Sequence, residues 1–319
     1  MPPFPAPAQA MVTDGTAAVG VLGTARVAII GGGLIGCSLA LALGRLGDRY
    51  HCALLDRDPA VVARIRALGI GHRADTDPAT IVADCDIILF CVPVLAMPAA
   101  AAAVAPHLPT GAIVSDAGSV KGSVVAALRA ALPAQVIVPG HPIAGRETSG
   151  PDAALADLFD QRLVMLCPAL PGADAAAPDG VQARGRIAAL WRDAGAEVRD
   201  LALDAHDSVY ALVSHMPHAV SYALARSVSD GLPPDLQDSG GGALRDMTRI
   251  AGSDPVMWRD IFLANRDALL SAMDAFTGEL VRLRGAIAAA DGDAIATYIR
   301  SANTAHTRVK PRGTPPGKA

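Results

Sequence analysis

The residue of this chain best suited to proton transfer is His141, within the run GHPIAG at 140–145. A neutral imidazole accepts a proton near physiological pH. Ser119 is a candidate to hydrogen-bond either His141 or a bound cofactor, and Lys121 lies two residues further on. The ordinary alternatives are a solvated or helix-capping histidine, a turn or N-cap serine, and a solvated lysine.

A second polar group lies in the C-terminal half, in the motif SHMPH that begins at Ser214. His215 and His218 are three residues apart, a spacing that can suit a metal. No Asp, Glu or Cys joins them locally, so we expect no metal, with one histidine packing or capping and the other facing a cleft. Asp246 and Arg249 would share a helix face. They form either a surface ion pair or a unit in which Asp246 orients Arg249 to bind a substrate carboxylate.

These side chains require a frame, and its clearest element is RVAIIGGGLIG at 26–36. Gly31 would permit a tight turn, Gly33 would let the backbone approach a pyrophosphate, and Gly36 would let a helix pack on the sheet. The helix N-terminus would then hold the phosphates. This pattern predicts a dinucleotide-binding unit rather than a plain glycine-rich turn. The expected cofactor contacts in this run are Gly31, Gly33, Leu34, Ile35 and Gly36.

A second apolar strand, at 52–55, ends at Asp56, twenty residues beyond Gly36. Folds of this kind place a carboxylate there that binds the adenosine ribose hydroxyls, which favours NAD over NADP. Arg57 complicates this preference, since it could pair with a 2'-phosphate.

Further apolar runs extend the expected sheet. The run at 87–92 is typical of a buried parallel strand. Ligands bind beyond the carboxyl ends of such strands, so we expect Val92 and Pro93 to line the cofactor cleft rather than merely end a strand. Other strands are expected at 111–116, 135–138, 163–167 and 196–198, all in one sheet, with helices at 59–68 and 122–131. His141 would then lie on a loop at the cofactor end.

From Asp204 onward the pattern is helical only. Asp204 is a plausible N-cap for a helix through Val213, and Pro217 would interrupt that helix before a second stretch to Ser227. Longer helices are expected at 255–284 and 293–307. A helical half of this kind usually buries its apolar faces against a second copy, so we expect a homodimer.

We therefore expect an α/β Rossmann-type dinucleotide-binding domain followed by an all-α helical dimerisation domain. The expected boundaries are a flexible tail at 1–24, the NAD-binding domain at 25–203, the helical domain at 204–309 and a second tail at 310–319.

Composition narrows the class of ligand. The 319 residues are 51% hydrophobic and 18% charged, with a net charge of −4, so no basic field favours nucleic acid or an anionic membrane. An uncharged stretch at 87–106 contains three prolines, which suits a strand, a turn and a helix better than a membrane span. A small-molecule substrate is expected.

The cysteines are odd in number, unpaired in spacing and mostly within apolar runs. They predict buried free thiols in a reducing, cytoplasmic compartment and no metal cluster. These residues are Cys37, Cys52, Cys85, Cys91 and Cys167.

Four blocks together make the sequence recognisable. They are GSVK at 118–121, HPIAG at 141–145 with Glu147, SHMPH at 214–218, and RDMTRIA at 245–251 followed by Asp254-Pro255 and Trp258. In this order, behind a dinucleotide loop, they resemble the prephenate/arogenate dehydrogenase family of tyrosine biosynthesis from about Arg26 to Thr307.

The resemblance implies an NAD-dependent oxidative decarboxylation, with prephenate or arogenate as substrate and tyrosine as a candidate feedback inhibitor. It implies that His141 accepts the hydrogen bond of the substrate's 4-hydroxyl and that Ser119 orients His141 and the nicotinamide. It further implies that Arg249 and His218, with Ser214 and Asp246 nearby, hold the substrate's carboxylate end. Glu147 matches a gating acid, whereas Arg146 stands where relatives have a smaller polar residue, which affects side-chain selectivity.

Two other classes remain open. A 3-hydroxyacid dehydrogenase would place a catalytic lysine on an early helix of the second domain, where this chain has His215 and His218. A non-catalytic NAD-binding sensor would need neither His141 nor Arg249.

Overall fold

The computed structural model describes residues 24–173 and 178–309. Apart from Thr24, the tails expected at 1–24 and 310–319 lie outside the described residues.

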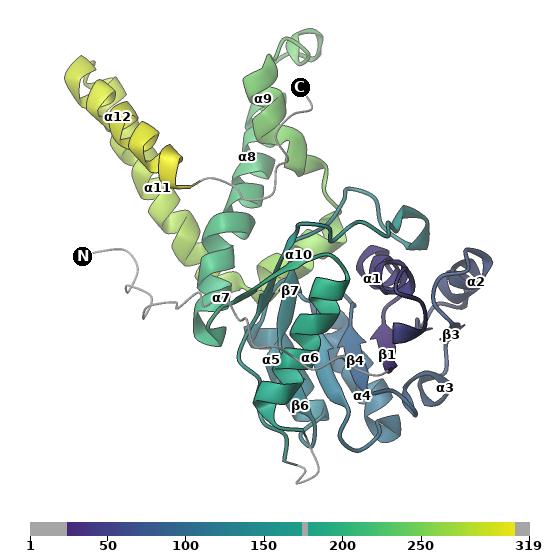
Figure 1. Cartoon of the computed structure of the whole chain (residues 1–319). Coiled ribbons are helices and arrows are strands. Elements are labelled where there is room, and N and C mark those ends of the chain that lie inside the picture. Colours follow the sequence, from purple (N-terminus) through teal and green to yellow (C-terminus); the bar gives the residue numbers. More distant parts are fainter. Residues whose placement is uncertain (1–23, 174–177, 310–319) are drawn as a thin grey trace.

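The N-terminal half is built on a parallel six-stranded sheet with the order β3-β2-β1-β4-β5-β6 (Figure 1). Its strands are β1 Ala25–Ile30, β2 Tyr50–Leu55, β3 Arg73–Asp75, β4 Ile87–Phe90, β5 Ile113–Asp116 and β6 Val136–Val138. All four residues of β4 and of β5 are buried. Strand β4 is accordingly apolar throughout, whereas the buried Ser115 and Asp116 of β5 are hydrogen-bonded. The strand order reverses between β1 and β4, and ligands of doubly wound sheets bind at such a switch point.

Helices cover both faces of this sheet. They are α1 Leu34–Gly44, α2 Pro59–Ala67, α3 Pro78–Val82, α4 Met97–Val104, α5 Gly122–Ala131 and α6 Gly180–Asp193. Apolar side chains of α1, α2 and α6 form one core, and those of α3, α4 and α5 form the other. Short 3₁₀ turns lie at Gly47–Arg49, Val94–Ala96, Ala105–His107, Pro151–Ala153, Pro234–Leu236 and Arg249–Gly252.

The expectation that the strands near 163–167 and 196–198 extend this sheet was wrong. They are β8 Leu163–Leu166 and β9 Glu197–Asp200, which form a separate sheet with β7 Gly140–Pro142 in the order β7-β8-β9. After β6 the chain passes through Pro139, which has no N–H to donate, and β7 pairs antiparallel with β8 instead. His141 therefore lies in a strand, opposite Met165, and not on a loop.

The C-terminal half is helical, as expected. Its helices are α7 Leu203–Tyr210, α8 Met216–Gly231, α9 Gly242–Thr248, α10 Pro255–Ala264, α11 Arg266–Ala288 and α12 Gly292–Arg308. Through Trp258 and Ile261, α10 packs into the core that contains α4 and α5.

Three local predictions in this half were wrong. Asp204 lies inside the first turn of α7, and Ala202 occupies the N-cap position. Pro217 lies in the first turn of α8 and does not end the helical path, which continues from α7 without a gap. The irregularity is a π-helical turn just before α8, at Ala211–His215. The long helix expected at 255–284 is two helices, separated at Asn265.

The hairpin of α11 and α12 projects away from the rest of the molecule (Figure 1). Only Leu269 and Ala272 of α11 are buried, and no residue of α12 is. Exposed apolar side chains on this half include Val256, Leu263, Leu270, Leu280, Val281, Ile287 and Ile299. In the part of the chain that the structure describes, no helix combines the length and apolar character needed to cross a membrane.

Candidate active site

The glycine turn between β1 and α1 has the geometry that a dinucleotide requires. Gly31 has a φ of +114°, and a Cβ there would lie 2.5 Å from the carbonyl oxygen of Cys91. A Cβ on Gly36 would lie 2.1 Å from the carbonyl oxygen of Gly31, so only glycine allows this helix to approach the turn. Gly33 faces open space. As the N-cap of α1 it makes no side-chain cap bond, and the first turn contains no acidic residue, so this helix end suits a phosphate.

Asp56 lies at the end of β2, beside that turn. One carboxylate oxygen accepts the N–H of Gly32 at 2.8 Å and the other accepts the N–H of Asp58 at 3.0 Å. Gly32 was not among the predicted contacts, although a Cβ there would lie 2.6 Å from the Cδ1 of Ile65. The carboxylate is thus fixed and only half-buried, as a ribose ligand should be, while Arg57 is exposed.

Val92 and Pro93 follow β4 on the other side of the turn. The Cγ1 of Val92 lies 3.1 Å from the position of a Cβ on Gly31. Pro93 is exposed and begins the 3₁₀ turn at Val94–Ala96. The glycine turn and the N-terminus of α1, with Val92 and Pro93 beside them, therefore have the chemistry that suits a dinucleotide pyrophosphate.

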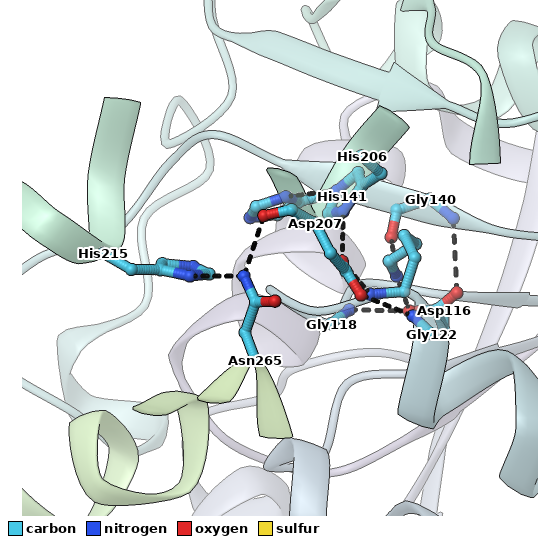
Figure 2. Close-up of polar contacts among 10 residues, drawn as sticks. Asp116, Gly118, Gly122, Gly140, His141, His206, Asp207, His215 and Asn265 are labelled. Carbon is cyan, nitrogen blue, oxygen red and sulfur yellow. Dashed lines mark hydrogen bonds and ion pairs between the residues drawn. The ribbon is translucent and has the colours of Figure 1, made fainter. Parts of the chain in front are cut away.

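His141 is buried, 7% exposed, and its ring contacts side chains of α7 (Figure 2). Its Nδ1 lies 3.0 Å from the Nε2 of His206, and the ring of Tyr210 packs at 4.4 Å between centroids. Among the described residues, no hydrogen bond joins Ser119 to His141. Ser119 lies half-buried in the loop between β5 and α5, so its role towards the cofactor remains a prediction.

Burial lowers the pKa of His141 well below 6.5, and repulsion from the cationic forms of its neighbours His206, Lys121 and His215 lowers it further. The imidazole is therefore neutral at physiological pH, which is the state a proton acceptor needs.

Lys121 is completely buried, which excludes the alternative of a solvated lysine. Its Nζ forms an ion pair with Asp116 and donates to the carbonyl oxygen of Gly140 at 2.7 Å. Asp116 also accepts the N–H groups of Gly118 and Gly140. The pair therefore ties the loop after β5 to β7 and fixes the backbone on which His141 stands.

Asp207 joins the two halves of the chain. Its carboxylate accepts the N–H of Lys121 at 2.7 Å and that of Gly122 at 2.8 Å, and so caps α5 from the helical half. The Nδ2 of Asn265 lies 2.9 Å from the carbonyl oxygen of Asp207 and 2.9 Å from the Nδ1 of His215. No local pattern in the sequence predicts this cluster, because α5, α7, the π-helical turn and Asn265, which precedes α11, meet only through the tertiary fold.

Of the two histidines of the SHMPH motif, one is packed in the interior, as expected, and the other is half-buried; that His218 faces a cleft stays a prediction. His215 is buried, and burial lowers its pKa to about 4. His218 is half-buried and stacks on Trp258 with 3.5 Å between ring centroids. Its Nδ1 lies 2.9 Å from the carbonyl oxygen of Ser214, so Ser214 positions His218 through its backbone.

Arg249 pairs with Glu147, at 3.5 Å between Nη1 and Oε1, and not with Asp246. The expected Asp246–Arg249 unit is absent because Arg249 begins a 3₁₀ turn after the end of α9, where the helical spacing no longer holds. The carboxylate of Asp246 instead lies 3.8 Å from the Nε of Arg245.

Within residues 24–173 and 178–309, no group of three or more His, Cys, Asp or Glu side chains is arranged to hold a metal ion. All five cysteines are free.

Together, the doubly wound sheet, the glycine turn at its switch point and the buried neutral histidine beside a helical second half define a dinucleotide-dependent dehydrogenase of the Rossmann type. Comparison with known proteins gives the family. Residues 39–198 match the model described as "Prephenate dehydrogenase, nucleotide-binding domain", and residues 203–301 match "Prephenate dehydrogenase, dimerization domain". The chain belongs to the prephenate dehydrogenase family.

Individual relatives agree with this assignment. The chain is 41% identical to a cyclohexadienyl dehydrogenase of Zymomonas mobilis, over 89% of this chain and 96% of the relative. It is 30% identical to a prephenate dehydrogenase of Bacillus subtilis, over 86% and 74% of the two chains. A crystal structure of prephenate dehydrogenase from A. aeolicus, in complex with hydroxyphenyl propionate and NAD+, has a TM-score of 0.80 and 30% identity. That match covers 91% of this chain and 99% of the other.

Proposed function

We propose that this protein catalyses the NAD-dependent oxidative decarboxylation of prephenate, of arogenate or of both, in tyrosine biosynthesis. The observation that carries the proposal is His141, a buried imidazole with a depressed pKa at the cofactor end of the fold. The relatives named above, a cyclohexadienyl dehydrogenase and a prephenate dehydrogenase, support the same reaction for this chain.

The reaction needs a hydride acceptor and a proton acceptor. Bound NAD supplies the first, by taking the hydride from the ring carbon that bears the 4-hydroxyl. His141 accepts the hydroxyl proton as that carbon is oxidised, so that a carbonyl forms. Carbon dioxide then leaves, its bonding electrons complete the aromatic ring, and the resulting phenolate takes the proton back from His141. A neutral base helps because positive charge grows on the ring while the hydride departs.

The remaining site residues divide between cofactor and substrate. Ser119 would orient the nicotinamide beside His141. The cofactor would contact Gly31, Gly33, Leu34, Ile35, Gly36, Asp56, Arg57, Val92 and Pro93. Arg249 and His218 would bind substrate carboxylate, with Glu147 paired to Arg249 and the backbone carbonyl of Ser214 positioning His218. The half-buried His218 stacks on Trp258, and its Nδ1 donates to the Ser214 carbonyl, which leaves Nε2 for a ligand. Nε2 would bind a carboxylate in the protonated imidazole, because in the neutral ring it is an acceptor.

We propose a homodimer that forms through the helical half, with domain boundaries at 25–203 and 204–309. The apolar side chains of α10, α11 and α12 that one chain leaves exposed support it. A second copy would cover this surface.

We also propose that tyrosine inhibits the enzyme, since it shares the phenol ring and side chain of the arogenate product. A cytoplasmic location agrees with five free cysteines, of which four are buried.

The decisive experiment follows NADH absorbance with purified protein, NAD and either prephenate or arogenate. Formation of NADH with one of them, and of the matching aromatic product, is the expected result. Binding of NAD without turnover of either substrate would instead indicate the sensor. Turnover of a 3-hydroxyacid alone would indicate the other dehydrogenase class.

A further inference from the structure

Three side chains from β7 and α7 lie in a row next to the proposed reaction centre (Figure 2). The Oδ1 of Asp207 is 2.8 Å from the Nδ1 of His206, and the Nε2 of His206 is 3.0 Å from the Nδ1 of His141. His206 is completely buried, so its two ring nitrogens have these two neighbours as their hydrogen-bond partners.

The direction of each hydrogen bond follows from the first member of the row. Burial opposes the charge of Asp207, but the hydrogen bonds from His206 and from the backbone of Lys121 and Gly122 keep the pKa of this carboxyl below its usual value. The ionised carboxylate only accepts, so the Nδ1 of His206 carries a proton. In neutral His206 the Nε2 is then an acceptor, and His141 must donate to it from Nδ1. The Nε2 of His141 is left with a free lone pair.

We propose that His206 and Asp207 are positioning residues for the reaction, which hold His141 in the tautomer whose Nε2 accepts the substrate proton and which stabilise the positive charge that His141 then acquires. This inference rests on the proposed function. When Nε2 gains the hydroxyl proton, the proton on Nδ1 is shared with or passed to the Nε2 of His206. The positive charge then lies against the carboxylate of Asp207. When the product oxygen takes the proton from the Nε2 of His141, the shared proton returns to the Nδ1 of His141.

The other titratable groups around the pair do not supply this charge. Lys121 and Asp116 neutralise each other in their ion pair. Burial lowers the pKa of His215 to about 4 and raises the pKa values of Tyr210 and Cys167, so these three are uncharged. Among the described groups facing His141 and His206, Asp207 is therefore the charge without a compensating partner.

Asp207 is a poor place for the first test, because it also caps α5 and its loss would disturb the contact between the two halves. His206 allows a sharper comparison. In His206→Gln the side-chain oxygen can take the position of Nε2 and accept from His141, but it cannot take up a proton. In His206→Phe a ring remains and the acceptor is lost.

We expect His206→Phe to lower kcat about a hundredfold or more with the Kd of NAD unchanged, since His141 loses its preferred tautomer. His206→Gln should keep kcat within about tenfold and move the acid limb of the pH profile down by about half a unit or more. The downward shift follows because the proton can no longer lie on the imidazole nearest Asp207. A merely structural role would not move this limb. His107→Gln, the same change at an exposed histidine, is the matched control.

Two results would overturn the proposal: wild-type kcat and pH profile in both His206 variants, or a wild-type His141 protonated on Nε2. The second is measured by nitrogen-15 NMR of the histidine rings in the intact enzyme with NAD bound. That spectrum still decides the tautomer if His206→Phe does not fold. It also separates the two proposals, because a protein inactive towards prephenate and arogenate would refute the function while the spectrum still reports on the row.

Discussion

The guanidinium of Arg249 and the carboxylate of Glu147 face each other from the two halves of the chain, 3.5 Å apart and both about two-thirds exposed. An exposed ion pair of this length adds little to stability, so both groups remain free to exchange partners. A substrate carboxylate could replace Glu147 at little cost. In this structure Arg249 thus binds a carboxylate, that of Glu147, which comes from the half of the chain that carries His141.

Arg249→Ala should raise the KM for prephenate by at least about tenfold, because the loss of one charge-assisted contact costs about 1.5 to 3 kcal/mol. The Kd of NAD, measured by titration, should stay nearly unchanged. Arg245→Ala is the matched control, since Arg245 is a neighbouring exposed arginine that lies against Asp246 instead. An unchanged KM in Arg249→Ala would remove this residue from the site.

Asp56 predicts the choice of cofactor. Its carboxylate, held by the N–H groups of Gly32 and Asp58, would accept both ribose hydroxyls and repel a 2'-phosphate. The kcat/KM with NAD should exceed that with NADP by at least about tenfold, or roughly 1.4 kcal/mol. Asp56→Ser should narrow this ratio, whereas Asp58→Ser should leave the ratio close to wild type. Equal efficiencies in the wild-type enzyme would contradict the assignment.

The buried ion pair between Lys121 and Asp116 predicts a large effect on stability. Lys121→Met would leave the carboxylate of Asp116 buried without its charged partner, which typically costs about 3 to 5 kcal/mol of unfolding free energy. Urea denaturation checks this value. Arg226→Met, in an exposed pair with Asp230, should leave the midpoint almost unchanged. Similar urea midpoints for the two variants would show that the buried pair makes no net contribution to the free energy of unfolding.

The sequence predicted those features that a local pattern determines. Helix α5 begins and ends at the predicted residues, because Gly122 to Ala131 is amphipathic and bounded by turns. The glycine turn and Asp56 were found because their spacing is set by one βαβ unit. The antiparallel pairing of β7 with β8 was missed, because Pro139 redirects the chain and partner choice depends on contacts distant in sequence.

The candidate site likewise divides into features that a local sequence pattern predicts and features that only the tertiary fold creates. His141 was identified from its own motif, but the groups that determine its protonation were not. Lys121 looks like a surface charge until its partner is known, although Asp116, which ends a mostly apolar run, was an available signal. His206 and Asp207 lie on a helix with no motif of their own, and only the packing of α7 against β7 brings them to His141.

The final prediction concerns the pH dependence of His141. Its pKa lies well below 6.5 in the folded protein, and the active form is the neutral one. Activity that depends on His141 is therefore complete above the folded pKa and is lost as the pH falls through it. The acid limb of the pH profile should thus lie below 6.5, lower than an unperturbed imidazole would place it.

His141→Asn retains a polar side chain of similar reach but cannot take a proton, so kcat should fall about a hundred- to ten-thousandfold. The variant should bind NAD with a wild-type Kd, and its residual activity should show no acid limb. Measurement of kcat from pH 4 to 8, together with NAD titration and thermal unfolding, separates a lost base from a lost fold. If a folded His141→Asn variant that binds NAD retains near-normal kcat, His141 is not the base, and His218 becomes the residue to test.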